Sequence, residues 1–255
     1  MDYDAVVVGG GHAGIEASLC LSRLGNSTLL ITQNLDCIAK LSCNPAIGGL
    51  AKGNLVREID ALGGEMARFI DATMIQFRML NRSKGPAVQA PRAQADKAGY
   101  AALAKKTLEI QNGLSLFQDT VTDLTIDRTG AAIQGVITER GHRISAKTVV
   151  LTTGTFMEGR IFIGDFTASS GRLGEPAAVG LGTSLRKKGF AVGRLKTGTP
   201  ARVLRSSLDL ESMTEQQGEE VQLPFSFSNT APLLHDETCP MARGSRGAHR
   251  AGWVQ

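Results

Sequence analysis

The sequence has few aromatic residues and no long apolar run. One Trp and two Tyr occur among 255 residues, which argues against a binding surface built on aromatic side chains. No apolar stretch approaches the roughly 20 residues that span a membrane. Asp2 and Asp4 stand where a secretory signal peptide would be basic. These absences predict a cytoplasmic protein without a membrane partner.

Cysteine is scarce, and its spacing matches no metal site. Cys20, Cys37, Cys43 and Cys239 form no CxxC pair and no pattern of a disulfide-rich secreted domain. We therefore expect reduced thiols and no metal centre. Positive charge is not concentrated either. The net charge of +4 arises from Lys and Arg spread along the chain, which permits a polyanionic partner without indicating one.

Glycine, in contrast, is abundant, and it marks the stretch around which the chain is organised. The apolar run Ala5–Val8 stops at three glycines and continues as a helix-forming segment, which predicts a strand, a tight turn and a helix. Gly9 allows the turn, Gly11 lets the main chain approach a pyrophosphate, and Gly14 lets the helix pack on the strand. The phosphates would lie at the helix N-terminus.

The second predicted strand, residues 27–32, should end beside the ribose of a bound nucleotide. A dinucleotide fold usually has an Asp or Glu there, but this chain has Thr32-Gln33-Asn34. This departure disfavours a simple NAD-dependent dehydrogenase. Neutral side chains can still hydrogen-bond a ribose, so Thr32 and Asn34 are candidate cofactor contacts.

Downstream, the pattern alternates between helices and short strands. It predicts helices at 54–70, interrupted by Gly63-Gly64, at 94–111 and at 177–187, and strands at 114–117, 121–126, 132–138 and 143–146. Residues 148–155 then return to the main sheet and end at a glycine. This order resembles flavoproteins that bind FAD in an extended pose, in which a late glycine turn, here Gly154, lies beside the cofactor. The predicted fold is α/β: a FAD/NAD(P)-binding Rossmann-like three-layer fold with a parallel sheet, helices and a β-meander crossover, in incomplete form.

Two stretches, a loop and a basic segment, have the composition of binding segments. Residues 41–53 are dense in Gly, Pro and Asn, and Cys43 within them, taken alone, is more often a small buried residue than a nucleophile. Residues 75–97 carry Arg78, Arg82, Lys84 and Arg92. By charge alone this stretch is as compatible with a solvated loop as with a phosphate or RNA contact.

Six motifs in order along the chain resemble one family. They are Gly-Gly-Gly-His-Ala-Gly at 9–14, Ser-Cys-Asn-Pro-Ala-Ile-Gly-Gly at 42–49, Asp-Ala-Leu-Gly-Gly at 60–64, Ser-Lys-Gly-Pro-Ala-Val at 83–88, Arg-Ala-Gln-Ala-Asp at 92–96 and Gly-Arg-Leu-Lys-Thr-Gly-Thr-Pro at 193–200. The resemblance is to the MnmG (GidA) family of tRNA uridine 5-carboxymethylaminomethyl modification enzymes, and it runs from residue 2 to about residue 229.

The resemblance implies a FAD-dependent enzyme that acts on the wobble uridine of tRNA. The family acts with the GTPase MnmE, forms a homodimer, and uses methylenetetrahydrofolate as carbon donor and NADH as reductant. Carried over by position, the cofactor contacts are Gly9, Gly10, Gly11, His12, Ala13, Gly14, Val121 on the adenine side, and Ala178 where the family often has Ser. Cys43 matches a functionally important family cysteine, which reverses its interpretation as a buried thiol.

The resemblance also implies a domain division and leaves two alternatives. Residues 1–200 form the FAD-binding domain, 201–231 begin an inserted domain, and 232–255 are a disordered tail outside the family pattern. One alternative is a folate- and FAD-dependent tRNA uracil methyltransferase related to TrmFO, against which the 42–49 motif argues. The other is a truncated, inactive FAD-binding remnant.

Overall fold

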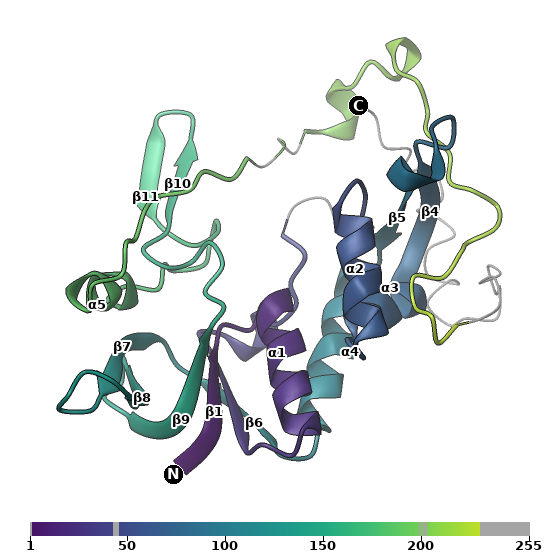
Figure 1. The fold of residues 1–255 in the computed structure, drawn as a ribbon. Coiled ribbons are helices and arrows are strands. Elements are labelled where there is room, and N and C mark those ends of the chain that lie inside the picture. Colours follow the sequence, from purple (N-terminus) through teal and green to yellow (C-terminus); the bar gives the residue numbers. More distant parts are fainter. Residues whose placement is uncertain (1, 43–45, 199, 201–202, 230–255) are drawn as a thin grey trace. The chain divides into compact units, whose positions relative to one another are not determined.

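The computed structural model describes residues 2–42, 46–198, 200 and 203–229. The chain divides into two compact units (Figure 1). Unit 1 comprises Met1–Ser42 and Lys97–Lys196, and unit 2 comprises Cys43–Asp96 and Thr197–Gln255. Among the described helices, none is long and apolar enough to cross a membrane.

Unit 1 is built on a six-stranded sheet with the order β6-β2-β1-β9-β8-β7. Its strands are β1 (Asp2–Val8), β2 (Thr28–Thr32), β6 (Leu114–Gln118), β7 (Val121–Ile126), β8 (Ile133–Thr138) and β9 (Arg143–Leu151). The first four in spatial order pair in parallel, and β9, β8 and β7 pair antiparallel. In this register Val6 lies between Leu29 and Val149. The parallel strands therefore align their carboxyl ends at one edge of the sheet.

Both faces of the central strands are covered. Val6 and Val7 are fully buried, as expected for a parallel strand with layers on each side. Helix α1 (His12–Arg23) packs against β1, β2 and β6, beside α4 (Lys97–Glu109). Helix α5 (Leu181–Lys187) packs on β7, and its Leu181 and Leu185 join the core cluster of Val6. The result is the three-layer arrangement of a Rossmann-like fold.

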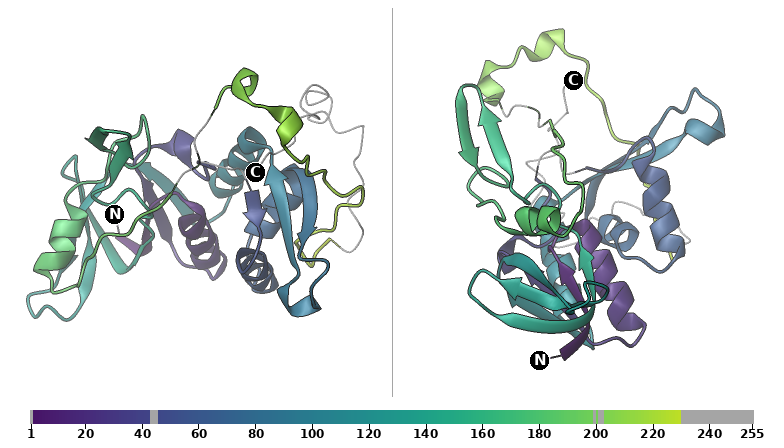
Figure 2. Two further views of the ribbon diagram at one scale, coloured as in Figure 1. Left: turned by 90° about the horizontal axis from the view of Figure 1, so that it is seen from above. Right: turned by 60° about the vertical axis from the view of Figure 1, so that its left-hand side comes forward.

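Two smaller elements complete unit 1. The 3-10 helix η1 (Leu35–Cys37) follows β2, and β10 (Arg160–Ile163) pairs antiparallel with β11 (Phe166–Ser169). Figure 1 and the right-hand view of Figure 2 show this hairpin extending away from the six-stranded sheet.

Unit 2 is a three-stranded antiparallel sheet with two helices. The strands β3 (Ala46–Gly48), β5 (Ala90–Ala95) and β4 (Met74–Leu80) lie in that order, and the helices are α2 (Lys52–Ala61) and α3 (Met66–Thr73). Short 3-10 turns occur at η2 (Pro86–Val88), η3 (Arg205–Ser207) and η4 (Leu210–Ser212). Ile47, Ile70, Phe77 and Phe225 are fully buried and form the centre of this unit.

The predicted α/β fold with a parallel sheet and a meander crossover is confirmed, with local differences. The predicted strands at 143–146 and 148–155 are one strand, β9, because its first half pairs with β8 while almost its whole length follows β1. The helix predicted from residue 94 begins at Lys97, because residues 90–95 pair with β4 instead. The predicted domain boundaries at 200 and 231 stay a prediction, and the predicted tail at 232–255 lies outside the described residues.

Candidate cofactor-binding site

The turn between β1 and α1 requires glycine at two positions for steric reasons. Gly9 has φ of +112°, and a Cβ atom there would lie 2.5 Å from the carbonyl oxygen of Thr152. A Cβ atom at Gly14 would lie 1.8 Å from the carbonyl oxygen of Gly9. Real Cβ atoms do not approach oxygen this closely, so α1 can pack on the end of β1 only with hydrogen in both places. These two glycines serve the fold.

Gly11 serves a different purpose, because nothing crowds it. It is the N-cap of α1, with φ of −80° and ψ of −177°, and a Cβ atom there would have no described atom within 4 Å. His12, Ala13 and Gly14 begin the helix without negative charge. The first N–H groups of a helix have no intrahelical acceptor and carry the positive end of the dipole. Open space before such a helix end fits the pyrophosphate of a dinucleotide cofactor.

Thr152 ties the glycine turn to the neighbouring strand, a role that the sequence pattern did not indicate. It directly follows β9, and its N–H donates to the carbonyl of Val8 at 2.9 Å. Its hydroxyl lies 2.8 Å from the carbonyl oxygen of Val8 and 3.1 Å from that of Gly9. A polar β-branched residue at the carboxyl end of a strand beside the turn is the signal that could have identified it.

The side chains of both predicted ribose contacts have local roles. A Cβ atom at Gly10 would lie 2.9 Å from the Thr32 hydroxyl, so Thr32 packs directly on the glycine turn. The exposed Asn34 caps η1, where its Oδ1 accepts from the N–H of Asp36 at 2.8 Å. That leaves the Asn34 amide nitrogen as the group that can donate to a ligand.

The remaining predicted contacts differ in what they can offer a cofactor. Val121 begins β7 and is 3% exposed, so only its main chain can reach a ligand. Gly154, with φ of +56°, follows β9 by three residues, and no described atom lies within 4 Å of a Cβ there. Ala178 donates its N–H to the carbonyl of Phe156 at 2.8 Å and accepts from Glu158 at 2.8 Å.

One aromatic contact fixes the start of α1 on α4. The rings of His12 and Tyr100 meet edge to face at 5.7 Å between centroids. Burial desolvates the Tyr100 phenolate and raises its pKa far above the ordinary value, with a smaller contribution from the charge of Glu16. Tyr100 therefore stays neutral and acts as a packing partner.

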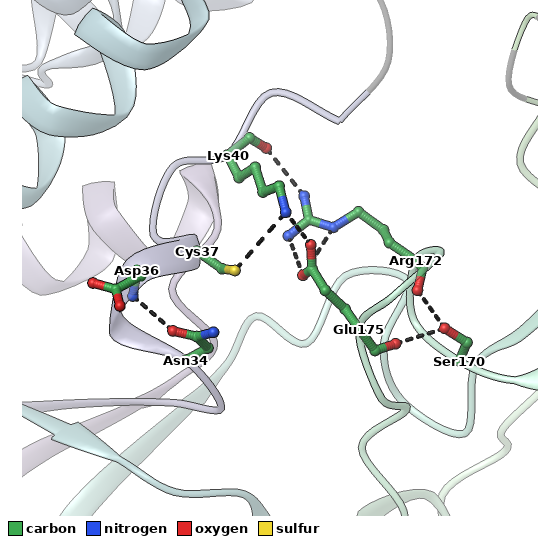
Figure 3. Close-up of polar contacts among 7 residues, drawn as sticks. All are labelled: Asn34, Asp36, Cys37, Lys40, Ser170, Arg172 and Glu175. Carbon is green, nitrogen blue, oxygen red and sulfur yellow. Dashed lines mark hydrogen bonds and ion pairs between the residues drawn. The ribbon is translucent and has the colours of Figure 1, made fainter. Parts of the chain in front are cut away.

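A charged cluster of Lys40, Arg172 and Glu175 lies on the same unit (Figure 3). The ammonium of Lys40 pairs with Glu175 Oε1, and Arg172 donates to Glu175 Oε2 from Nη2 at 2.7 Å and from Nε at 3.2 Å. Partial burial of the Glu175 carboxyl tends to raise its pKa. The hydrogen bonds and charges of the two cations outweigh this effect, and the pKa lies below its ordinary value. Glu175 is therefore ionised at neutral pH.

The second predicted site cannot be placed in full. Cys43 lies outside the described residues. Of the basic residues predicted as phosphate or RNA contacts, Arg78 and Arg92 face each other in the β4–β5 register, and Arg82 pairs with Glu219. A solvated loop does not describe the whole of this stretch, because Met74–Leu80 and Ala90–Ala95 form β4 and β5. Among the described residues, no group of three His, Cys, Asp or Glu side chains could hold a metal ion.

The chain is similar to several known proteins. Residues 4–245 match the family model described as glucose inhibited division protein A. The chain is 62% identical over 236 residues to a Treponema pallidum protein and 63% identical over 229 residues to a Borreliella afzelii protein. Both are named tRNA uridine 5-carboxymethylaminomethyl modification enzyme MnmG. These matches cover 89% and 90% of this chain but 37% of each relative.

A solved structure shows the same fold. GidA from Aquifex aeolicus superposes with a TM-score of 0.86 at 47% identity, over 92% of this chain and 39% of that one. The GidA-related protein from Thermus thermophilus is more distant, with a TM-score of 0.52 at 27% identity over 74% of this chain and 69% of that one. The chain thus spans well under half the length of the curated relatives that it matches.

Proposed function

The chain belongs to the glucose inhibited division protein A family, and on that premise we propose that it is the FAD-binding part of an enzyme that modifies the wobble uridine of tRNA. One observation carries the proposal. The N-terminus of α1 at Gly11 has open space that fits a dinucleotide. It occurs in a chain about 60% identical to proteins named as tRNA uridine modification enzymes.

In this proposal each predicted residue has a defined contact. The N–H groups at the start of α1 bind the pyrophosphate, and Gly9, Gly10 and Gly14 give the turn its shape. Thr32 and Asn34 serve the ribose, the main chain of Val121 serves the adenine, and Gly154 and Ala178 line the path beyond the turn. FAD bound there supplies hydride and one-carbon transfer chemistry, which protein side chains lack.

The further partners follow from the same membership. We propose Cys43 as the catalytic thiol, NADH as the reductant and methylenetetrahydrofolate as the carbon donor. tRNA is the proposed substrate, the GTPase MnmE and a second copy of the chain are the proposed protein partners, and the cytoplasm is the proposed location. Residues 1–200 are assigned to FAD and 201–231 to the start of an inserted domain.

The chain matches 37% of the length of each of these relatives. A chimera tests the assignment directly. Residues 2–229 would replace the matching N-terminal part of the Treponema pallidum relative in a bacterium that lacks its own family member. We expect mass spectrometry of tRNA nucleosides to detect restored 5-carboxymethylaminomethyluridine. A well-expressed chimera that binds FAD but yields unmodified uridine, or 5-methyluridine instead, would contradict the proposal.

A further inference from the structure

The segment after η1 lies directly on the glycine turn. The N–H of Ala39 donates to the carbonyl oxygen of Gly10 at 3.1 Å. A Cβ atom at Gly10 would lie 3.1 Å from Cγ1 of the buried Ile38. Lys40 therefore follows a residue that is hydrogen-bonded to the predicted cofactor site.

The loop of residues 170–175 is connected to the same glycine turn through Phe156. Thr152 contacts Gly9, as described above, and the N–H of Phe156 donates to the carbonyl of Thr153 at 3.2 Å. The Arg172 guanidinium lies 5.0 Å from the centroid of the Phe156 ring. A Cβ atom at Gly171 would come within 2.1 Å of that ring, so the loop is seated closely on Phe156.

The charged cluster joins these two segments (Figure 3). Besides the pairs with Glu175, Arg172 Nη1 donates to the carbonyl oxygen of Lys40 at 3.2 Å. The hydroxyl of Ser170 lies 2.6 Å from the carbonyl oxygen of Glu175 and also contacts that of Arg172, which fixes the loop shape. The side chain of Glu175 is 14% exposed and that of Arg172 is 21% exposed. Partial burial makes such pairs stronger than exposed ones.

These contacts form a closed ring. It runs from Gly10 through Lys40 to Glu175 and Arg172, then through Phe156 and Thr152 back to Gly9. Residues predicted to touch the cofactor lie along it: Gly154 stands between Thr152 and Phe156, and Ala178 is hydrogen-bonded to Phe156. A dinucleotide that made these predicted contacts would lie against the ring.

We propose that Glu175 is a positioning residue that retains the bound dinucleotide by closing this ring between Lys40 and Arg172. The inference rests on the proposed function, since it concerns release of FAD from the same site. The carboxylate is the only group of the cluster that attracts both cations. Without its charge Lys40 and Arg172 repel each other, and only the hydrogen bond from Arg172 to the Lys40 carbonyl still joins the two segments. The ring is then weaker, and FAD leaves faster.

The test is the rate of FAD release from the full chain, followed by recovery of flavin fluorescence after dilution. Glu175→Gln keeps the side-chain size and removes the charge. We expect its release rate to rise about tenfold, the effect of losing one charge-assisted interaction, with little change in the association rate. Lys147→Gln is the control, because it breaks the exposed pair with Asp4 in the same unit and should leave release unchanged.

Lys40→Met removes the cation that pairs with Glu175, and it is expected to accelerate FAD release as well. A purely structural effect would lower the melting temperature of the FAD-free protein and leave the release rate of the folded fraction unchanged. Release from folded Glu175→Gln and Lys40→Met at the wild-type rate would overturn this inference alone. Failure of the wild-type chain to bind FAD would overturn the proposed function together with it.

Discussion

The carbonyl oxygen of Gly9 lies so close to α1 that a Cβ atom at Gly14 would be 1.8 Å from it. Gly11, between them in the sequence, has open space where its Cβ would be. The same turn therefore contains glycines of two kinds. Gly14 is required for the helix to pack on the strand, and Gly11 is the position at which we propose that the ligand approaches.

These two roles predict opposite results for the same added methyl group. Gly14→Ala should destabilise the chain by about 1–3 kcal/mol, the typical cost of overpacking. Gly11→Ala should cost at most about 1 kcal/mol, the difference between Gly and Ala as N-cap, yet it should abolish FAD binding. Urea unfolding and FAD titration of both variants measure the two effects. A Gly11→Ala protein that binds FAD like the wild type would refute the assignment of this position.

Removal of the Thr152 hydroxyl is predicted to lower both stability and FAD affinity. Thr152→Val keeps the shape and removes the contacts with Val8 and Gly9, so we expect about 1 kcal/mol of destabilisation and weaker FAD binding. Thr148→Val is the matched control, because its hydroxyl donates to the carbonyl of Asp4 at an exposed position. Equal effects of the two variants on FAD affinity would show that Thr152 does not shape the site.

The proposed thiol chemistry gives a third prediction. In the chimera, Cys43→Ser should reduce tRNA modification by roughly two orders of magnitude or more, as expected for removal of a catalytic group, while FAD binding stays intact. Cys20→Ser on the exposed face of α1 should change neither property. Full modification by the Cys43→Ser chimera would remove Cys43 from the mechanism.

In unit 2, the surroundings of Asp71 predict that the stability of the chain depends on pH. Its carboxylate accepts from the N–H groups of Phe225 at 2.7 Å and Ser226 at 3.0 Å, and Asp60 accepts from the hydroxyl of Ser226 at 2.8 Å. Burial, and to a lesser degree the Asp60 charge, raise the pKa of Asp71 above its ordinary value despite these hydrogen bonds and the one from Asn229.

A raised pKa in the folded state means that the native chain holds this proton more tightly than the unfolded chain. The Asp71 contribution to stability is therefore complete below the unfolded pKa of about 3.9. It is lost as pH rises through the folded pKa. As pH rises over that range, we expect the free energy of unfolding of the wild type, measured by urea unfolding, to fall relative to that of Asp71→Asn. Asp165→Asn, at an exposed turn, is the control, and a pH-independent difference for Asp71→Asn would contradict the prediction.

Local patterns predicted the parts of the fold that local chemistry determines. The glycine spacing at 9–14 identified the strand, turn and helix, because Gly14 meets a steric need within six residues, the contact with the Gly9 carbonyl, and Gly9 takes the positive φ of the turn. The break between α2 and α3 was likewise predicted from Gly63-Gly64. β5 was missed, because its sequence Ala-Pro-Arg-Ala-Gln-Ala is poor in strand formers and its pairing with β3 and β4 holds it in the sheet. β4 was missed as well, although Ile75 and Phe77 favour a strand.

The contacts that surround the turn were not predicted, because they join residues that are far apart in the sequence. Lys40 and Glu175 are 135 positions apart, and Thr152 contacts a turn 143 positions away. No periodicity or motif relates such residues, because their contact depends on how the crossover returns the chain to β1. The ring around the turn is a property of topology, which a single sequence does not display.

The most direct test of the account is the visible spectrum of the purified chain, followed by FAD titration with flavin fluorescence. We expect one equivalent of flavin per chain, with bands near ~375 and ~450 nm that are typical of bound flavin. Loss of binding in Gly11→Ala would place that flavin at the α1 N-terminus. A folded, colourless chain that takes up no added FAD would contradict the central claim that its glycine turn is a working cofactor site.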